Sequence, residues 1–493
     1  MSSLHFTTAE KKTETSVRTR TLHNLFWLLC STGLSTIVNM TTNFFVARKL
    51  GATTFGQWSL ILTTASWITV LRSAVGSDLI RTSAHNREYG RTIFIPALLT
   101  LMAGAVFLGS ASLLANTALI QTNSILLPSV TMEAAVGVLA VMIIPISLFA
   151  GRDRMQWQLA DGTQSLFLLL SLFTIAGQGL TIGKIASAYM TTALLVCTPI
   201  MIAGAWKIKP LLSVSVTLLR RFLIDCGHLF LTNWLYLLHL GLDLYVLQVL
   251  RSSSEVGVYS AALKLVVTLG MFPLLLFASL TPELTRRAAS GDFEYVRNIW
   301  LTAARSLTIL SGALALFLFI MSDKIIHIAY GDTYAATGKV LRVLCIALVP
   351  RFIQVVSQSL LFVAGEYVEL NRGFGFGVVV QASVCMLLVP GLGPRGAAIA
   401  FIAAECATLM SLSRSAFRVF GKPSLSALIK TVVSVIAAIV FGVLLLACDL
   451  SAQLTFCAAA SFYLLLAYLS GCFSLQDLRS CRSLLAGMLG RRA

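Results

Sequence analysis

The sequence contains little charge. Asp, Glu, Lys and Arg make up 12% of its 493 residues, whereas 57% are hydrophobic and the mean hydropathy is +0.86. Soluble globular chains carry about twice that share of charged residues, so a water-soluble enzyme is excluded. Apolar runs of about 20 residues, the length needed to cross a hydrocarbon core of about 30 Å, recur along the whole chain. The composition therefore predicts a polytopic membrane protein.

Motifs that would indicate nucleotide, metal or redox chemistry are also absent. The sequence has no Walker-type GxxxxGK[ST] segment, and GFGFG at 373–377 opens a predicted span instead of following a strand, so we expect no ATP site. There is no CxxC motif, and the six histidines lack metal-ligand spacing, so no metal and no other cofactor is predicted. The ten cysteines lie almost entirely within apolar spans, which implies no disulfide framework.

The apolar runs give about fourteen predicted spans of roughly 20 residues each. They run approximately from 24 to 46, 57 to 79, 92 to 115, 130 to 150, 163 to 180, 185 to 205, 226 to 249, 257 to 281, 303 to 322, 340 to 362, 374 to 390, 397 to 417, 428 to 448 and 454 to 472. The connections are too short to bury a second core. The predicted fold class is an all-α polytopic membrane protein without an extramembrane domain.

The basic residues predict the orientation. An even number of spans places both tails on one side, and most of the 37 Lys and Arg lie in the tails and in the loops on that side. Because such residues are retained in the cytoplasm, both termini are predicted to be cytoplasmic. The net charge of +17 then reflects topology and contacts with anionic membrane lipids, so a nucleic-acid partner is not expected.

One internal match indicates a repeat. NFFVARKLGATTFGQWS, which begins at Asn43, resembles DLYVLQVLRSSSEVGVYS, which begins at Asp243. Six predicted spans separate the two copies, and this even number means that both halves cross the membrane in the same direction. We therefore expect two parallel-repeat lobes of six helices around a central cavity, followed by two C-terminal helices. The predicted segments are a tail over 1–23, lobes over 24–210 and 211–420, helices 13 and 14 over 421–473, and a tail over 474–493.

Two spans in repeat-related positions carry polar stripes when their residues are placed at 100° intervals. The stripe of span one consists of Thr32, Ser35, Thr36, Asn39, Thr42 and Asn43. The stripe of span seven consists of Asp225, His228, Thr232, Tyr236, His239 and Asp243, and is about 27 Å long. Such groups can hydrogen-bond between helices and hold a bundle together. Acids and histidines on one face are costly in lipid, which favours a hydrated cleft lined by both stripes.

Basic residues within spans also require an explanation, because a charge at the centre of a bilayer costs about 2.5–3.5 kcal/mol on insertion scales. Arg72 in span two and Lys264 in span eight are expected to line the cleft. Arg351 in span ten has two interpretations that the residues leave open: a buried pair with Glu405, or a contact with substrate. Cations in a cleft favour an anionic substrate, and phosphate is the anion that Arg and Lys bind best.

A family resemblance rests on several segments at span ends. They are "ARKLGATTFGQWSLI", "VYSAALKLV" continuing to "TPELTRRAASGD", "IAYGDTYAATGKVLRVLCIAL" and "GLGPRGAAIAF". In their order, these segments resemble the polysaccharide transporter family of oligosaccharide-lipid flippases. That family belongs to the multidrug/oligosaccharidyl-lipid/polysaccharide (MOP) exporter superfamily, which also contains multidrug antiporters and peptidoglycan-precursor flippases. The resemblance implies two six-helix lobes in a V around a central cavity.

The resemblance also implies a substrate and a location. The substrate would be an undecaprenyl-diphosphate-linked sugar repeat unit, moved from the cytoplasmic to the periplasmic leaflet of a bacterial inner membrane for exopolysaccharide, capsule or O-antigen. A polysaccharide polymerase and co-polymerase are implied partners. Candidate diphosphate ligands are Arg72, Lys264 and Arg351; candidate sugar contacts are Asn39, Asn43, Tyr236 and His239; candidate ion-coupling residues are Asp225, Asp243 and His228.

Two other functions are weighed against this one. An ion-coupled multidrug antiporter of the same fold would favour acids in its cavity, since many of its substrates are cationic, and the embedded bases disfavour it. A membrane-embedded polysaccharide polymerase or ligase would usually expose a catalytic loop on the outer side. The longest predicted outer connection, 323–339, is short for such a loop, so we expect a transporter and not an enzyme.

Overall fold

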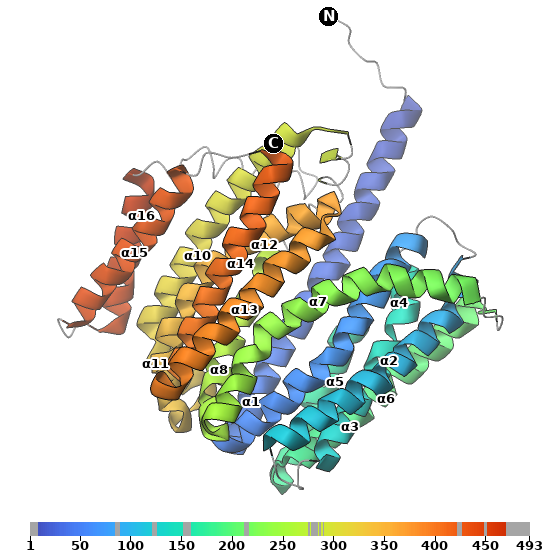
Figure 1. Ribbon diagram of the computed structural model, residues 1–493, viewed down its shortest axis with the longest axis horizontal. Helices are drawn as coiled ribbons and strands as arrows, with labels where there is room; N and C mark the ends of the chain where they lie inside the picture. Colours follow the sequence, from blue (N-terminus) through green and yellow to red (C-terminus); the bar gives the residue numbers. More distant parts are fainter. Residues whose placement is uncertain are drawn as a thin grey trace, which may run out of the picture.

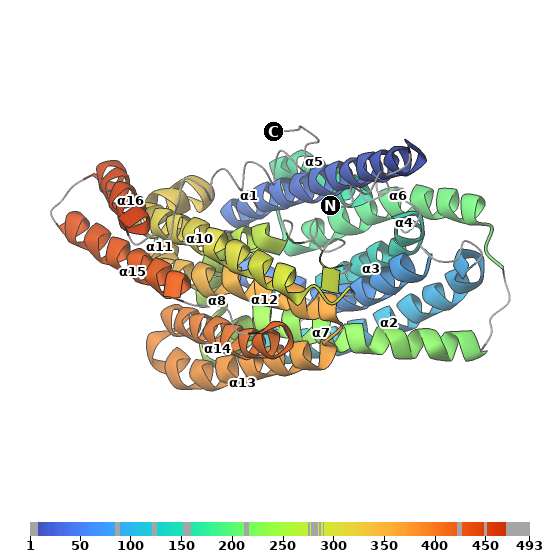
Figure 2. The ribbon, with the colours of Figure 1, turned by 90° about the horizontal axis from the view of Figure 1, so that it is seen from above.

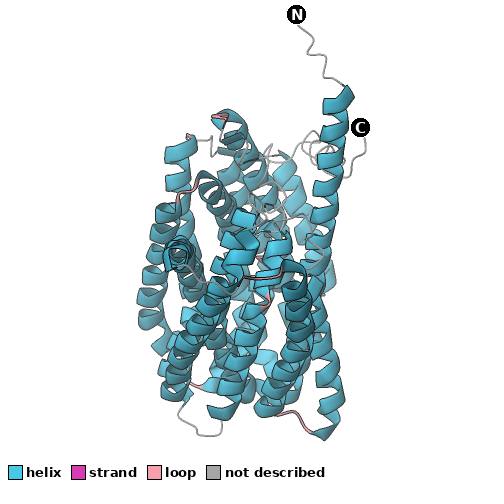
Figure 3. Cartoon of the chain, turned by 90° about the vertical axis from the view of Figure 1, so that its right-hand side faces the viewer, coloured by secondary structure: helices cyan, strands magenta, loops and turns pink. Residues whose placement is uncertain are grey.

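In the computed structural model the chain forms a bundle of long helices, and no strand occurs within the part that is described (Figure 3). The structure describes residues 8–83, 89–120, 126–150, 159–211, 216–274, 277, 284, 287–288, 290–421, 426–447 and 451–469. Hydrophobic side chains dominate the interior, and many large hydrophobic side chains are also exposed, as expected of helices that pack against one another and against lipid.

The first repeat begins with α1 (Thr8–Ser83), which contains two membrane crossings joined at Gly51. Gly51 has φ 73° and ψ 169°, a conformation that glycine adopts without steric cost, and the chain reverses direction there. We call this end of the bundle the hairpin side, and the opposite end, where α1 begins, the tail side (Figure 1). The repeat continues with α2 (Tyr89–Ile120), α3 (Leu126–Val141), α4 (Ile143–Ala150), α5 (Leu159–Ile175), η3 (Ala176–Gln178) and α6 (Ile182–Ile208).

The second repeat begins with α7 (Val216–Leu250) and α8 (Ser253–Leu269), joined by a tight connection in which Ser252 caps α8 by accepting from the amide of Glu255. It continues with α10 (Phe293–Tyr330), η4 (Asp332–Tyr334), α11 (Ala335–Leu344), η5 (Cys345–Ala347), α12 (Leu348–Ala364), α13 (Tyr367–Leu392) and α14 (Pro394–Phe420). Two further helices follow, α15 (Ser426–Ala447) and α16 (Ala452–Leu469).

The predicted number of spans is confirmed. Ten segments of the described chain are long and apolar enough to cross a membrane, and one of them, Ser31–Leu79, has 49 residues and crosses twice about Gly51. Three shorter apolar helices cover Leu159–Ile175, Val432–Leu445 and Ala452–Leu466. Counting the double crossing as two and each short helix as one gives fourteen.

The repeat is visible where the second crossing of α1 meets α8. A Cβ on Gly56 would collide with the carbonyl oxygen of Ser253, and a Cβ on Gly257 would collide with that of Ala52. These contacts exchange under the sequence offset, since Ala52 corresponds to Ser253 and Gly56 to Gly257. The two helices therefore cross at a pseudo-two-fold axis, and glycine at both positions allows their backbones to touch.

The helices of the two repeats form neighbouring groups (Figure 1), and α15 and α16 pack along α10 at one edge of the second group (Figures 1 and 2). The helix α7 belongs to both groups. It packs against α13 over part of its length, and its N-terminal part lies across α2 of the first repeat. The space between the two groups is where a central cavity was expected.

Candidate functional site

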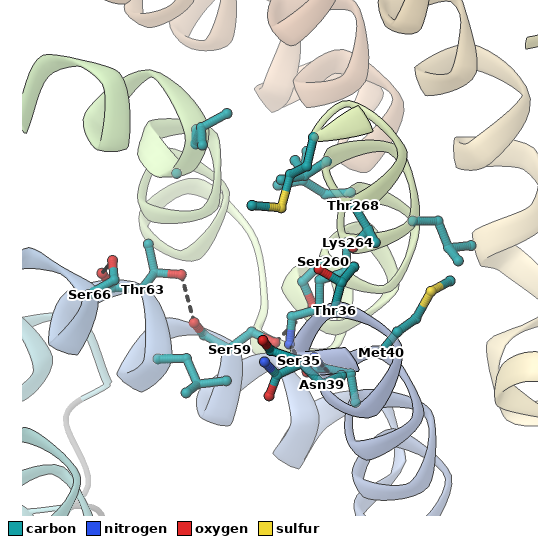
Figure 4. Close-up of a pocket in the computed structure, with 18 of the residues that line it drawn as sticks. Ser35, Thr36, Asn39, Met40, Ser59, Thr63, Ser66, Ser260, Lys264 and Thr268 are labelled. Atoms are coloured by element: carbon teal, nitrogen blue, oxygen red, sulfur yellow. Dashed lines mark hydrogen bonds between the residues drawn. The ribbon is translucent and has the colours of Figure 1, made fainter. Parts of the chain in front are cut away.

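A cavity of about 580 Å³ lies between the two repeats, bounded by α1, α5, α7 and α8. Figure 4 shows Ser35, Thr36 and Asn39 from α1 at its wall, with Ser260, Lys264 and Thr268 from α8 beside them. Hydroxyl and amide side chains supply most of its polar lining: Thr32, Ser35, Thr36, Asn39, Asn43, Ser59, Thr63, Ser66, Gln164, Ser165, Ser260 and Thr268. Five of the six residues of the polar stripe predicted for span one thus face a cavity; the sixth, Thr42, is buried.

The hairpin side of this cavity is closed. At its floor the hydroxyls of the repeat-related Ser59 and Ser260 are 3.1 Å apart and hydrogen-bonded, directly above the Gly56–Gly257 crossing. Nearer the surface, Nε of Arg48 donates to the carbonyl of Ala329 at 3.0 Å.

A second contact beside this arginine joins the same two regions of the chain. The hydroxyl of Tyr334 donates to the carbonyl of Ala47 at 3.0 Å. We call the Ser59–Ser260 contact together with these two ties the hairpin-side closure. It joins α1 to the second repeat.

Lys264 lies at the deep end of the cavity, next to the closure. Its Nζ donates to Oδ1 of Asn43 at 2.7 Å and lies 4.5 Å from the ring centroid of Phe55. Among the described residues, no carboxylate oxygen lies within 4 Å of it. Its positive charge is therefore stabilised by an amide oxygen and an aromatic face, and it is not neutralised by an acid.

Arg72 lies nearer the tail side and is neutralised. Its guanidinium donates to Oδ1 of Asp161, in the first turn of α5, at 2.6 Å. The side chains are 19% and 41% exposed, so an entering ligand can reach both. Sequence reasoning did not single out Asp161. An acidic residue at the start of an apolar span could have indicated a functional position, but its pairing with Arg72 depends on how distant helices pack.

Arg351 is almost fully buried in the second repeat and does not line the cavity. Its guanidinium donates to Oε1 of Glu405 at 2.6 Å and to the hydroxyl of Tyr236 at 3.1 Å. Nε2 of His239 lies 3.3 Å from the same carboxylate oxygen, between the rings of Phe374 and Phe401. Of the two interpretations of Arg351, the buried pair is the one the structure shows.

The four described members of the α7 stripe do not line the cavity, so the structure does not show two matching wet faces there, contrary to the prediction. Its members Tyr236 and His239 contact Arg351 and Glu405 inside the second repeat and are not among the residues that line the cavity; their role as sugar contacts stays a prediction. The described residues of α7 that line the cavity are Leu237, Leu240, Gly241 and Leu244. The described members of the stripe contact polar groups of neighbouring helices, such as Asn371 of α13 and Glu405 of α14, which lowers the cost of placing them away from water.

Other members of that stripe follow the same pattern. Asp243 is fully buried and accepts hydrogen bonds from the Tyr259 hydroxyl and, at 2.8 Å, from the backbone amide of Leu244. The hydroxyl of Thr232 donates to Oδ1 of Asn371 at 2.7 Å. The remaining two members, Asp225 and His228, lie in α7, and their side chains fall outside the described residues. Ion coupling through Asp225, Asp243 or His228 stays a prediction.

Two six-helix repeats around a polar cavity that is closed at one end define a membrane transporter. The chain belongs to the polysaccharide biosynthesis protein family, which it matches over residues 21–287, more than half of its length. It also matches the MatE family over residues 229–387. Comparison with curated protein sequences gives no significant match. The family resemblance drawn from the sequence is confirmed.

Solved structures share the fold. The lipid II flippase MurJ in an inward closed conformation is similar with a TM-score of 0.68 and 14% identity, covering 89% of this chain and 97% of MurJ. An inward-facing multidrug resistance MATE family transporter of the MOP superfamily gives 0.63 and 17%, covering 79% and 96%. A MOP superfamily transporter from Pyrococcus furiosus gives 0.62 and 14%, covering 82% and 97%. The fold is that of MOP transporters.

Proposed function

We propose that the protein is a flippase for undecaprenyl-diphosphate-linked oligosaccharide repeat units. It moves the headgroup from the cytoplasmic to the periplasmic leaflet of a bacterial inner membrane, with both termini in the cytoplasm, and a polymerase assembles the units into exopolysaccharide, capsule or O-antigen. The single observation that supports this most is the cavity itself. Among the described residues its lining is rich in hydroxyl and amide groups, and the charged members Arg72, Asp161 and Lys264 leave one excess positive charge.

The chemistry of the headgroup matches that lining. Each unpaired hydroxyl costs about 1–3 kcal/mol in an apolar medium, so an oligosaccharide needs a path that replaces its water. Side chains such as Asn39 and Asn43 can donate to and accept from sugar hydroxyls. The cations serve the anionic part of the headgroup. The isoprenoid tail stays in the bilayer beside the cavity, where it needs no polar partner.

Transport by this fold requires the two repeats to move against each other. With the hairpin side closed, a headgroup enters from the tail side. Opening of the hairpin-side closure and approach of the tail-side ends would release it to the other leaflet. The sequence offset relates Ser59 to Ser260 and Gly56 to Gly257, so the closure joins equivalent positions of the two parallel repeats, where relative movement of the repeats would separate them.

The proposal is tested in a strain from which the gene is deleted. The strain should accumulate lipid-linked repeat units on the cytoplasmic side and lose polysaccharide export, and the wild-type chain should restore export. Lys264→Ala and Arg72→Ala should fail to restore it at normal membrane levels. The matched control is Lys324→Ala, which removes an exposed lysine of α10 that is not among the cavity residues. Normal export by both cavity variants contradicts the assignment.

The MatE match favours a second candidate, an ion-coupled multidrug antiporter. Such a protein would change the drug tolerance of the cell. A deletion strain whose drug tolerance falls while its lipid-linked repeat units stay at wild-type levels supports the antiporter. Accumulation of repeat units with unchanged tolerance supports the flippase.

A further inference from the structure

The two cations of the cavity lie at different depths. We propose that Arg72 binds the diphosphate of the substrate, whereas Lys264 binds a carboxylate on its sugar chain, so that the flippase is selective for repeat units that contain an acidic sugar. This inference rests on the proposed function, because it assigns parts of the same lipid-linked substrate to separate positions in the same cavity.

The Ser59–Ser260 hydrogen bond gives a common level from which depth can be counted. Arg72 lies thirteen residues beyond Ser59 toward the tail side, and Lys264 lies four residues beyond Ser260 in the same direction. At 1.5 Å per helical residue, the two backbone positions differ in depth by about 13 Å.

The side chains do not shorten this separation. The Nζ atom of Lys264 lies nearer the hairpin side than its backbone, because it donates to Asn43. Asn43 and Ser59 lie the same number of residues from Gly51, so they are at about the same depth. Arg72 is held by Asp161, in the first turn of α5 at the tail side. The phosphorus atoms of a diphosphate share one oxygen, so a single diphosphate is too short to contact both cations. A short oligosaccharide linked to that diphosphate can span the distance.

The depth at which the lipid holds the diphosphate determines which cation the diphosphate can contact. The isoprenoid tail keeps the diphosphate near the level of the lipid headgroups. Arg72 lies seven residues, or about 10 Å, from Leu79, the last residue of the apolar segment Ser31–Leu79 within the described residues, and a long arginine side chain can reach toward the tail side. Lys264 is at the closed end of the cavity, where only the distal part of the headgroup arrives.

The charge at Lys264 indicates what that distal part carries. A neutral sugar needs only hydroxyl and amide partners, which the lining already supplies. An ammonium group within the membrane is costly, and the Phe55 ring face and one amide oxygen satisfy it only in part, because neither carries a negative charge. A carboxylate would form a charge-assisted hydrogen bond there. The chemical class that fits is therefore a sugar acid such as a hexuronate.

The experiment compares two probes that differ in one group. Undecaprenyl-diphosphate-linked trisaccharides that end in glucuronic acid or in glucose are titrated against the full-length protein in nanodiscs. The wild type should bind the acidic probe about tenfold more tightly, the effect of one additional charge-assisted hydrogen bond. Lys264→Gln should reduce this ratio to about one, and Lys264→Arg should preserve it. Arg72→Gln should weaken both probes alike and leave the ratio unchanged.

A further variant and a third probe keep the outcomes distinct. Lys264→Met keeps a long unbranched side chain without the charge, so together with thermal unfolding it separates loss of charge from loss of folding. Equal affinity of the wild type for both probes, or an unchanged ratio in Lys264→Gln and Lys264→Met, overturns the inference and leaves the flippase proposal standing. If the wild type binds neither probe nor sugar-free undecaprenyl diphosphate, the flippase proposal itself fails.

Discussion

The hairpin-side closure can be locked by a disulfide between repeat-related positions. The hydroxyl oxygens of Ser59 and Ser260 are 3.1 Å apart, so sulfur atoms in their place need to approach by only about 1 Å to reach the disulfide bond length of about 2.0 Å. The double variant Ser59→Cys/Ser260→Cys should therefore cross-link readily under oxidising conditions. Because transport requires this closure to open, the cross-linked protein should not flip its substrate.

The size of the effect follows from the fraction of molecules that can still open. A preparation in which about 90% of the molecules are cross-linked should flip a fluorescent lipid-linked oligosaccharide in proteoliposomes at about one-tenth of the reduced rate. A reductant should restore the rate. The cross-link also closes a loop of about 200 residues, which should stabilise the folded protein by about 5 kcal/mol in the chain-entropy description. Peptide mass spectrometry measures the cross-linked fraction.

The chain offers a matched control within one repeat. Ser357 on α12 and Ser413 on α14 have hydroxyl oxygens 3.0 Å apart, and both helices belong to the second repeat. A disulfide at this pair joins helices that should move together, so it should leave transport largely intact. Full transport by protein cross-linked at Ser59 and Ser260 would refute the idea that the closure opens during the cycle, and so would equal inhibition by the control pair.

Three further predictions concern the crossing, the buried cluster and the cavity mouth. Gly257→Leu places a side chain against the facing backbone and should destabilise the closed state by about 1–3 kcal/mol, seen as a broader spin-label distance distribution across the crossing; an unchanged distribution contradicts this. Arg351→Met removes the arginine partner of the buried Glu405 and leaves only His239 beside it, so it should cost about 3–5 kcal/mol in thermal unfolding, and adding Glu405→Leu should recover much of that loss; wild-type stability of the single variant contradicts the pairing. Asp161→Asn should change stability by less than about 1 kcal/mol, because the pair is partly exposed, while freeing Arg72 to bind undecaprenyl diphosphate severalfold more tightly in a binding titration; unchanged affinity would remove Arg72 from the diphosphate site.

The asymmetry between the repeats is the main finding that the sequence did not predict. Asn43 and Asp243 occupy equivalent positions, and both lie on polar stripes of the same period. In the structure Asn43 faces the cavity beside Lys264, whereas Asp243 is buried against Tyr259. The same helical spacing of polar residues thus lines the cavity in the first repeat and forms internal hydrogen bonds in the second.

The sequence by itself determined the spans, their all-helical character, the parallel repeat and the family. Each of these depends on local composition or on similarity along the chain: about 20 apolar residues are needed to cross a membrane, and backbone groups in lipid must be satisfied within the helix. The close packing at Gly56 and Gly257 was also encoded in the repeat, since the motif aligned these two glycines.

Tertiary structure alone decided which partner each polar side chain meets. Helical periodicity shows that residues share a face, but a polar face is satisfied equally by water and by buried partners, so the sequence could not choose between them for α7. The same reason explains Arg351, whose charge is neutralised by Glu405 from another helix, and Arg72, whose pairing with Asp161 brings together residues 89 positions apart. Those choices arise only when distant helices pack, and they leave Lys264 as the cavity cation without an acidic partner among the described residues.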